Sequence, residues 1–372
     1  MYILRDLIVV GAGPVGSQLA KRFSDKGVDV LVIERSKSIG EPLACSGHVS
    51  PDIRDFLSDG EFEEILQNGI NGADFHLNGE YRFFRDEKVS YVIDRIELDR
   101  KKARQAEDSG AEIALGENVE SVEEEEERVI VDTDNASYEA RMVAGCDGAS
   151  SKVRDETGLP EPDHFYQGVL CFTDEEDSSD FVDVTLDVPS FFGWRIPRGD
   201  SVEYGVAVPK GENPMEWLDN ITDRFNVDDK KDVCAGAIPV GPPDSVTSDR
   251  VFLVGDAAAQ TKPFTGGGIL YGMRCSDIAS ECIDVDDPSS LQMYEEEWRS
   301  ELSDEIMLGR LIEKFYSLPS IVQKPALKLF QGRIGVHMDR PSTLFSLGQV
   351  KAMLLQGRLK SYFEDLNTAG SN

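Results

Sequence analysis

The sequence predicts a mixed α/β protein: a Rossmann-like nucleotide-binding domain, an inserted antiparallel-sheet domain and a C-terminal helical segment. Three observations favour this class. The N-terminal stretch LIVVGAGPVGSQLAKRFSDKGVDVLVIER has the order strand, glycine turn, helix, strand. Residues 182–188 alternate valine or leucine with other residues, which is typical of a half-buried strand. From residue 287 onwards apolar residues recur at steps of three and four, which indicates helices.

Charge excludes one class of partner. The chain has 372 residues and a formal net charge of −32 at pH 7. Such a surface repels phosphate backbones, so nucleic-acid binding is not expected. The acidic residues are spread along the chain, which favours a surface adapted to very high salt over an ordinary acidic protein, because salt screens their mutual repulsion.

The chain start and the hydropathy indicate the compartment. MYILRDLIVVGAG passes straight into a strand and a glycine motif, which is not typical of a signal peptide. No stretch approaches the roughly 20 apolar residues that span a bilayer. The six cysteines form no Cys-x-x-Cys pair, so a disulfide framework is not expected. We expect a cytoplasmic protein, either soluble or peripheral at the inner face of the cell membrane.

The glycine motif is the strongest single feature. Gly11, Gly13 and Gly16 fit Gly-x-Gly-x-x-Gly directly after a buried strand. The first permits the turn, the second lets a pyrophosphate approach the backbone, and the third lets helix and strand pack closely. Glu34 ends the second strand 18 residues beyond Gly16, where a carboxylate accepts hydrogen bonds from ribose hydroxyls. The pattern predicts a dinucleotide site; the alternative is a tight turn without a ligand.

Two later stretches, VAGCDGASSKVR at 143–154 and RVFLVGDAAAQTKPFTGGGI at 250–269, distinguish a flavin dinucleotide from NAD. In the second stretch a strand ends in Gly-Asp, a proline loop follows, and three glycines open a helix. The carboxylate of Asp256 can reach a ribityl hydroxyl. The amides of Gly268 and Ile269 can face the pyrimidine end of a flavin.

With these motifs in this order, residues 6–275 resemble the FAD enzymes of the p-hydroxybenzoate hydroxylase fold, and within them the geranylgeranyl reductases. The resemblance implies FAD as the cofactor. Arg95, in YVIDRIELDRKKARQA, matches an arginine beside the FAD, with a surface cap as the alternative, and Val119 matches a strand whose backbone meets the adenine. The cofactor residues predicted in total are Gly11, Gly13, Val15, Gly16, Glu34, Arg35, Cys45, Ser46, Gly47, Arg95, Val119, Asp256, Gly268 and Ile269.

The loop GEPLACSGHVS at 40–50 stands where the geranylgeranyl reductases carry a cysteine- and glycine-rich loop under the flavin. The resemblance implies that Cys45, Ser46 and Gly47 contact the cofactor. Cys45 as proton donor to the substrate is one hypothesis, and an inert packed thiol is the alternative. A nucleophile lacks an evident base. A metal site is not expected, because the four histidines are not spaced as ligand pairs.

A substrate slot is predicted further along. The family carries Tyr-x-Trp-x-Phe-Pro, then about seven residues, then Gly-x-Gly. This chain departs by having Phe for Tyr, Ile for Phe and Ala for the last Gly. All three stay apolar or small, so an apolar slot is retained, while a strand packed under the sheet is the alternative. The substrate residues predicted are Phe192, Trp194, Ile196, Pro197 and Gly205.

The resemblance implies an FAD-dependent reductase that saturates C=C bonds of geranylgeranyl chains in archaeal membrane phospholipids. Ferredoxin and NAD(P)H both remain open as electron donors. Saturation of a quinone side chain is a variant. An FAD monooxygenase or halogenase on a small aromatic, and a flavin-binding protein without turnover, are the competing functions.

The predicted domains are discontinuous. Residues 1–50, 92–160 and 245–285 form the FAD-binding domain, 51–91 and 161–244 the substrate domain, and 286–372 a helical region. Residues 321–362 contain seven Lys or Arg and one Asp. This segment predicts either a docked helical lid or a peripheral contact with anionic lipid.

Overall fold

The predicted order of strand, glycine turn, helix and strand is present at the N-terminus. In the computed structural model, which describes residues 4–43, 45–333 and 337–345, β1 (Leu4–Val10) and β2 (Val30–Glu34) are parallel neighbours. Helix α1 (Pro14–Ser24) connects them. It begins with Gly13 as the N-cap and a proline at its first position, where the missing N–H has no helical partner to lose.

The chain divides into two units. The first comprises residues 1–43, 94–165 and 237–306, and the second residues 44–93, 166–236 and 307–372. The predicted FAD-binding domain shares residues 1–43, 94–160 and 245–285 with the first unit, whereas the cysteine loop after residue 43 belongs to the second. The predicted C-terminal region is shared between the units, because the division falls inside helix α7 (Leu291–Tyr316).

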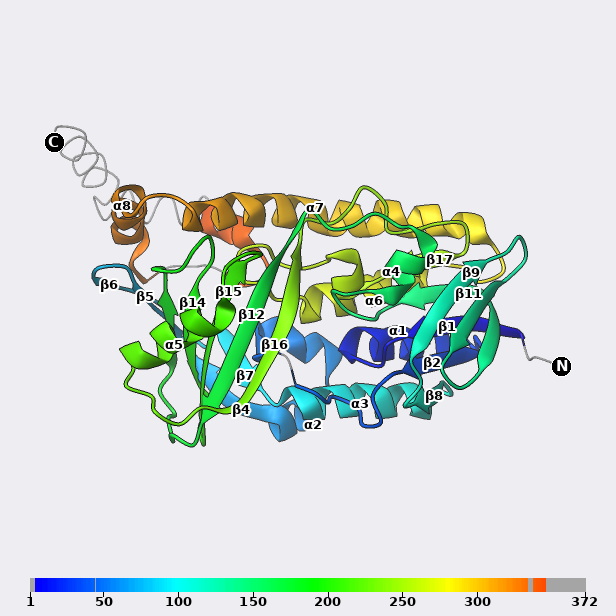
Figure 1. The fold of residues 1–372 in the computed structure, drawn as a ribbon, viewed down its shortest axis with the longest axis horizontal. Helices are drawn as coiled ribbons and strands as arrows, with labels where there is room; N and C mark the ends of the chain where they lie inside the picture. Colours follow the sequence, from blue (N-terminus) through cyan, green and yellow to red (C-terminus); the bar gives the residue numbers. More distant parts are fainter. Residues whose placement is uncertain (1–3, 44, 334–336, 346–372) are drawn as a thin grey trace. The chain divides into compact units, whose positions relative to one another are not determined.

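The first unit is built on a seven-stranded sheet with the order β8-β2-β1-β11-β10-β9, and β17 pairs with β11 (Figure 1). The four strands around β1 and the β11–β17 pair are parallel, whereas β9 and β10 pair antiparallel. The remaining strands are β8 (Glu112–Leu115), β9 (Val119–Glu124), β10 (Val129–Thr133), β11 (Ser137–Gly145) and β17 (Val251–Leu253).

Helix α1 packs against both α3 and α6 in the first unit. The core beneath them is a set of buried aliphatic side chains from β1, β2 and β11, extended by Trp298 and Tyr294 from α7. The other helices of this unit are α3 (Arg95–Asp108), α4 (Lys152–Thr157), α6 (Ile269–Cys282), η2 (Gly255–Ala258) and η3 (Pro288–Ser290).

The second unit holds most of an eight-stranded sheet with the order β16-β12-β15-β14-β13-β5-β6-β18, and a three-stranded sheet β3-β7-β4. The larger sheet is mainly antiparallel, but β13 with β5 and β18 with β6 are parallel pairs. Its strands are β5 (Gly72–His76), β6 (Glu80–Phe84), β12 (His164–Thr173), β13 (Phe181–Thr185), β14 (Gly193–Pro197), β15 (Val202–Pro209), β16 (Lys231–Val240) and β18 (Gly332–Arg333).

The three-stranded sheet places the cysteine loop, because β3 (His48–Val49) follows that loop directly and pairs with β7 (Ser90–Ile93). Strand β4 (Leu66–Ile70) completes it. The helices of this unit are η1 (Pro51–Phe56), α2 (Asp59–Ile65), α5 (Pro214–Arg224), α8 (Ser320–Phe330) and η4 (Pro341–Phe345). Among the residues described, no helix combines the length and the apolar character needed to cross a membrane.

Candidate cofactor and substrate sites

The three glycines of the turn after β1 have three different surroundings. A Cβ on Gly11, whose φ is +102°, would lie 2.5 Å from the Cys146 carbonyl oxygen. A Cβ on Gly16 would lie 2.0 Å from the Gly11 carbonyl oxygen, so helix and turn touch there. A Cβ on Gly13 would meet nothing within 4 Å. Two glycines are therefore required by packing, and the third leaves its backbone approachable, as a pyrophosphate requires.

Val15 brings the start of α1 to the start of α6. Its carbonyl oxygen accepts a hydrogen bond from the Ser276 hydroxyl at 2.9 Å. A Cβ on Gly272 would lie 2.5 Å from a Val15 methyl group, so the helices approach closely at these positions. Deeper along the pair, Arg22 holds Asp277 through two bonds of 2.7 and 3.0 Å. The two helix N-termini, each a source of free backbone N–H groups, are thus fixed against each other.

Asp256 and Gly268 lie side by side at this end of the unit. Asp256 lies in η2, directly after β17, and a Cβ on Gly268 would be 2.1 Å from its carboxylate oxygen. Gly268 is the N-cap of α6, and Ile269 is its first residue. Burial raises the pKa of Asp256, and the nearby charge of Arg95 opposes that shift. The predicted ribityl partner and the predicted flavin-facing helix start are therefore neighbours.

Arg95 is the first residue of α3, and the Asp94 side chain caps that helix. Its guanidinium binds both carboxylate oxygens of buried Asp99, at 2.6 and 2.9 Å. Sequence reasoning missed Asp99. Its signal was the i, i+4 spacing from Arg95, which places the two side chains on one face of the helix.

Glu34 accepts hydrogen bonds from the backbone N–H groups of Ala12 and Ser36, both at 2.8 Å. Its carbonyl oxygen accepts from the Glu117 N–H at 3.0 Å, which ties the segment before Val119 to the end of β2. The Val119 side chain is buried in the core, and Arg35 is exposed. The eleven cofactor residues predicted in the first unit thus lie in the turn after β1, at the end of β2, at the start of β9, in η2 and at the starts of α1, α3 and α6. The open Gly13, the paired helix starts and the acid at the end of β2 fit a dinucleotide.

The cysteine loop is defined by backbone contacts inside the second unit. Gly47 has a φ of +64°, and a Cβ there would lie 2.4 Å from the Ile93 carbonyl oxygen. The Ile93 N–H donates to the Gly47 carbonyl at 3.0 Å. Cys45 is partly exposed, as a free thiol, and Ser46 accepts from the His48 N–H. Small residues are needed here because β7 runs directly beside the loop.

The predicted substrate residues lie on the hairpin β14–β15. Trp194 is the register partner of Gly205, and a Cβ on Gly205 would lie 2.3 Å from the indole ring. The indole thus rests on the glycine backbone. Phe192 stacks on Phe191 with centroids 4.4 Å apart and meets Trp194 edge-on at 6.0 Å. Ile196 and Pro197 are buried, and Ile196 packs in a small apolar cluster with residues of β4, β7 and β13.

Two charged residues of the same hairpin were missed. Glu203 is completely buried, and its two oxygens accept from the Trp194 indole N–H at 2.7 Å and the Arg198 guanidinium at 2.8 Å. The signal was available: with a turn at 198–201, period-2 alternation puts residues 194, 196 and 198 on the same face as 203 and 205.

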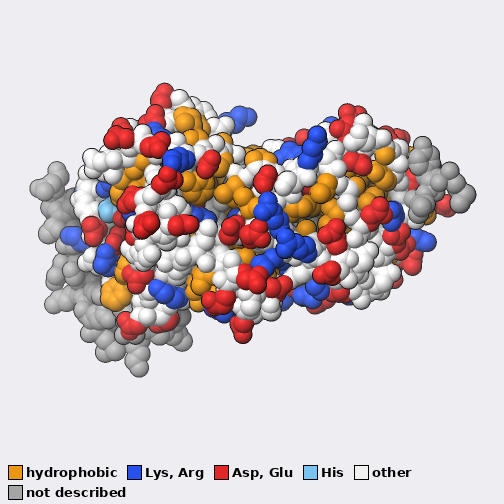
Figure 2. All heavy atoms as spheres, turned by 90° about the horizontal axis from the view of Figure 1, so that it is seen from below, with side chains coloured by type: hydrophobic (Ala, Val, Ile, Leu, Met, Phe, Trp, Pro, Cys, Tyr) orange, Lys and Arg blue, Asp and Glu red, His pale blue; other side chains and the backbone are white. Residues whose placement is uncertain are grey.

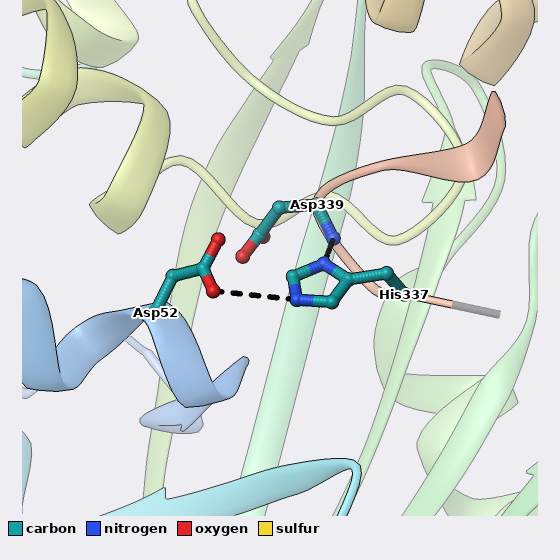
Figure 3. A group of neighbouring side chains, drawn as sticks. All are labelled: Asp52, His337 and Asp339. Atoms are coloured by element: carbon teal, nitrogen blue, oxygen red, sulfur yellow. Dashed lines mark hydrogen bonds and ion pairs between the residues drawn. The ribbon is translucent and has the colours of Figure 1, made fainter. Parts of the chain in front are cut away.

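One group of three metal-type ligands occurs among the described residues: Asp52, His337 and Asp339, with ligand atoms within 4.8 Å of one another (Figure 3). The Asp339 N–H donates to His337 Nδ1 at 3.2 Å, so a neutral ring carries its proton on Nε2, which faces Asp52 at 3.3 Å. A metal on Nε2 would need the opposite tautomer. Asp339 also accepts from Ser50, and Asp52 from Arg340 at 3.4 Å. The three side chains thus have hydrogen-bonding or ionic partners within the protein.

Comparison with known proteins places the chain. Digeranylgeranylglycerophospholipid reductase 1 of Methanococcoides burtonii is 32% identical over 345 residues, covering 84% of this chain and 84% of the relative. The chain belongs to the digeranylgeranylglycerophospholipid reductase family. Residues 6–214, more than half of the chain, match the family model described as lycopene cyclase protein, so the reductase belongs to that family too. The resemblance predicted from the sequence motifs is confirmed.

Solved structures confirm the predicted fold class of this reductase family member. A geranylgeranyl bacteriochlorophyll reductase-like protein from Thermoplasma acidophilum superposes with a TM-score of 0.80 at 20% identity, covering 98% of this chain and 99% of that one. A p-nitrophenol 4-monooxygenase from Pseudomonas putida has a TM-score of 0.75 at 17% identity, with 99% of both chains covered. A flavin-dependent brominase has a TM-score of 0.68 at 18% identity, with 97% and 100% covered.

Proposed function

We propose that the protein is an FAD-dependent reductase that saturates C=C bonds in the geranylgeranyl chains of a glycerophospholipid. The observation that carries the proposal is that this chain, a member of the reductase family, contains both a turn suited to a dinucleotide and an aromatic, apolar hairpin. The turn supplies a cofactor site with an open backbone at Gly13. The hairpin supplies a surface that suits an isoprenoid chain better than a polar substrate.

FAD, once reduced, supplies the hydride for a C=C bond, while a proton goes to the neighbouring carbon. The residues of the chain would bind the cofactor and orient the substrate. The N–H groups at the starts of α1 and α6 would hold the negatively charged pyrophosphate, and the Asp256 carboxylate would accept a hydrogen bond from a ribityl hydroxyl. Arg95, held by Asp99, fixes the local charge next to Asp256. The reducing equivalents come from a separate donor, of which ferredoxin and NAD(P)H are the candidate classes.

The aromatic hairpin orients the alkene and keeps water away. Phe191, Phe192 and Tyr316 form one cluster, with Tyr316 edge-on to both phenylalanines at 5.8 and 5.5 Å. Leu186, Leu327 and Phe75 belong to the same largely buried apolar cluster. An isolated C=C bond offers no polar handle, so orientation has to come from shape and dispersion contacts of this kind. Cys45 is the proposed proton donor.

The direct test is mass spectrometry of lipid products. Purified protein with chemically reduced FAD, in high salt and without oxygen, is given a geranylgeranyl glycerophospholipid. A ladder of about +2 mass units per step supports saturation. A new chromatographic peak of unchanged mass would indicate cyclisation, as the lycopene cyclase description suggests, and either that peak or unreacted lipid alone would contradict the proposal. Saturation of a quinone side chain alone would change the substrate, and oxygen uptake with an aromatic substrate would point to a monooxygenase or halogenase.

We further propose that the end of α7 and the start of α8 contact an anionic lipid surface. Five of the ten exposed large apolar side chains in the described part of the chain fall in this short stretch. Between residues 307 and 328 the exposed charged side chains are basic, at Lys314 and Lys328, in a chain of net charge −32. Apolar anchors with basic neighbours suit an anionic interface. The five are Met307, Leu311, Leu318, Ile321 and Val322.

Flotation with vesicles containing an anionic lipid tests this surface. The wild-type protein should float, and Leu311→Ser/Ile321→Ser should stay at the bottom, whereas Met215→Ser, an exposed apolar residue on α5, should float like the wild type. Wild-type protein that stays at the bottom in the presence of the vesicles would contradict the proposal. The predicted basic tail beyond residue 345 lies outside the described residues and is not needed for this test.

We also propose that the acidic surface is an adaptation to high salt. Figure 2 shows acidic side chains scattered over a whole face rather than gathered in one patch. At low ionic strength their repulsion is unscreened, so the thermal midpoint should rise as KCl is added to molar concentration. A midpoint independent of KCl would contradict the proposal.

A further inference from the structure

The hairpin β14–β15 connects the aromatic surface to the cysteine loop through buried polar groups. Trp194 lies on β14 and Arg198 directly follows that strand, so alternation directs both side chains to one face, and antiparallel pairing with β15 places Glu203 between them. The backbone turn is closed by the Arg198 N–H donating to the Ser201 carbonyl at 2.9 Å. All groups in this connection belong to the second unit.

The connection is continuous in hydrogen bonds. The Trp194 indole N–H donates to Glu203 Oε1 at 2.7 Å, and Arg198 Nη1 donates to Glu203 Oε2 at 2.8 Å. The same Nη1 donates to the Ser46 carbonyl oxygen at 2.5 Å. Arg198 Nη2 donates to the Gln67 side chain at 2.6 Å and to the Ile93 carbonyl at 3.2 Å. The Arg198 guanidinium therefore connects Glu203 of the hairpin to the backbone of the cysteine loop at Ser46 and to the backbone of β7 at Ile93.

Burial makes this connection stiff. Glu203 is 0% and Arg198 4% exposed, so neither charge can turn to water when a partner is lost. Burial raises the pKa of Glu203, while Arg198 and the Trp194 indole act to lower it. The planar guanidinium of arginine donates to several acceptors at fixed angles, whereas a lysine ammonium cannot. A displacement of the Trp194 indole should therefore displace the backbone at Ser46 through Glu203 and Arg198.

We propose that Arg198 and Glu203 are positioning residues that couple the ring of Trp194 to the backbone of the cysteine loop at Ser46. The proposal deepens the function proposed above and rests on it for its meaning in catalysis. Occupation of the aromatic surface by an isoprenoid chain then sets the position of Cys45, and the loop in turn holds the indole that the chain packs against.

The first test needs no turnover, so it is independent of the proposed reaction. The rate of alkylation of Cys45 by iodoacetamide is followed by peptide mass spectrometry, with Cys234 on β16 as the internal reference. Trp194→Phe keeps an aromatic ring but removes the donor to Glu203, and should change the Cys45 rate at least about twofold. Trp217→Phe is the matched control, because its indole N–H also donates to a glutamate, Glu212 at 3.2 Å, away from Arg198.

A double-mutant cycle identifies the path of the effect. In a Glu203→Gln background, Trp194→Phe should add little to the change in the Cys45 rate, because the connection is already broken. Fully additive effects of the two substitutions, or no response to Trp194→Phe in the wild-type background, would overturn the coupling. If Glu203→Gln does not fold, Arg198→Lys takes its place, since it keeps the charge but loses the fork.

Turnover gives the second readout. Arg198→Lys should lower kcat for the lipid more than it raises KM, with FAD affinity unchanged, and the loss should exceed that of Arg224→Lys, a surface arginine on α5. If Arg198→Lys and Arg224→Lys lower kcat equally, Arg198 has no positioning role. If the wild type itself turns over no lipid, the proposed function fails, while the alkylation result still decides the coupling.

Discussion

The turn after β1 and the hairpin β14–β15 are both held by close contacts, but of different kinds. In the turn, backbone meets backbone: the space for a Cβ at Gly16 is filled by the Gly11 carbonyl. In the hairpin, side chains meet side chains across a buried ion pair, Arg198–Glu203, and an indole lies on Gly205. A backbone-defined site depends on which positions are glycine. A side-chain network depends on partners that come together only in the folded chain.

The largest expected effect is in the hairpin. Arg198→Met leaves the buried Glu203 carboxylate without its charged partner, which should cost about 3–5 kcal/mol in the free energy of unfolding. Denaturant titration measures this. Arg224→Met on α5 is the control, because Arg224 is more than a third exposed and pairs weakly with Asp187 at 3.9 Å, so a change below about 1 kcal/mol is expected. Equal losses would remove the contrast between buried and surface pairs.

Gly205→Ala should come next. The added methyl group would lie 2.3 Å from the Trp194 ring, so the indole must move, at a cost of about 1–3 kcal/mol. Gly60→Ala on α2, where a Cβ meets nothing within 4 Å, should be close to neutral. Combining Gly205→Ala with Trp194→Leu should recover part of the stability. Failure to recover any would show that the indole is not the obstacle.

Asp256 offers a pH test of the first unit. Its folded-state pKa is raised by burial above the ordinary 3.8, so the folded protein retains a proton that the unfolded chain releases. Its contribution to stability is therefore lost as pH rises from 3.8 through the folded pKa. In flavin-free protein, Asp256→Asn should gain stability over the wild type as pH rises, while binding FAD more weakly. A stability difference that does not vary with pH would contradict this account.

The smallest effect on stability is expected at Gly13. Gly13→Ala adds a methyl group to open space at an ordinary backbone angle, so the free energy of unfolding should change by no more than about 0.5 kcal/mol. FAD affinity should nevertheless fall about tenfold or more, because the methyl group occupies the pyrophosphate approach. Gly16→Ala should instead lower the free energy of unfolding by more than Gly13→Ala does, because its methyl group would lie 2.0 Å from the Gly11 carbonyl oxygen. Undiminished FAD binding by the Gly13 variant would contradict the assignment.

The contrast explains what the sequence could predict. The positions of β1, α1 and β2 follow from an apolar run, three glycines and a terminal acid, all local in the chain. Asp256 and Gly268 were found for the same reason, because twelve residues separate them within one strand–loop–helix motif. Even the Trp194–Gly205 pair was visible as a family motif, although its cause, a ring resting on a glycine backbone, was not.

Arg198, Glu203 and Asp99 were missed because the spacing that brings each of them to its partner does not by itself show that the pair is buried. Glu203 stands in VEYGVAV, where an acid is expected on the solvent face of a strand, yet it is completely buried and pairs with Trp194 and Arg198. Likewise the assignment of the cysteine loop to the second unit depends on β3 pairing with β7, residues some forty positions away. Such contacts follow from topology and not from spacing.

The most direct test of the central claim is an anaerobic stopped-flow measurement of the flavin itself. Protein loaded with FAD and reduced by one equivalent of donor is mixed with geranylgeranyl glycerophospholipid, and the absorbance of oxidised flavin is followed. The account predicts that oxidation occurs without oxygen, in proportion to the C=C bonds offered, and not with the fully saturated lipid. A flavin that stays reduced until air is admitted would contradict it.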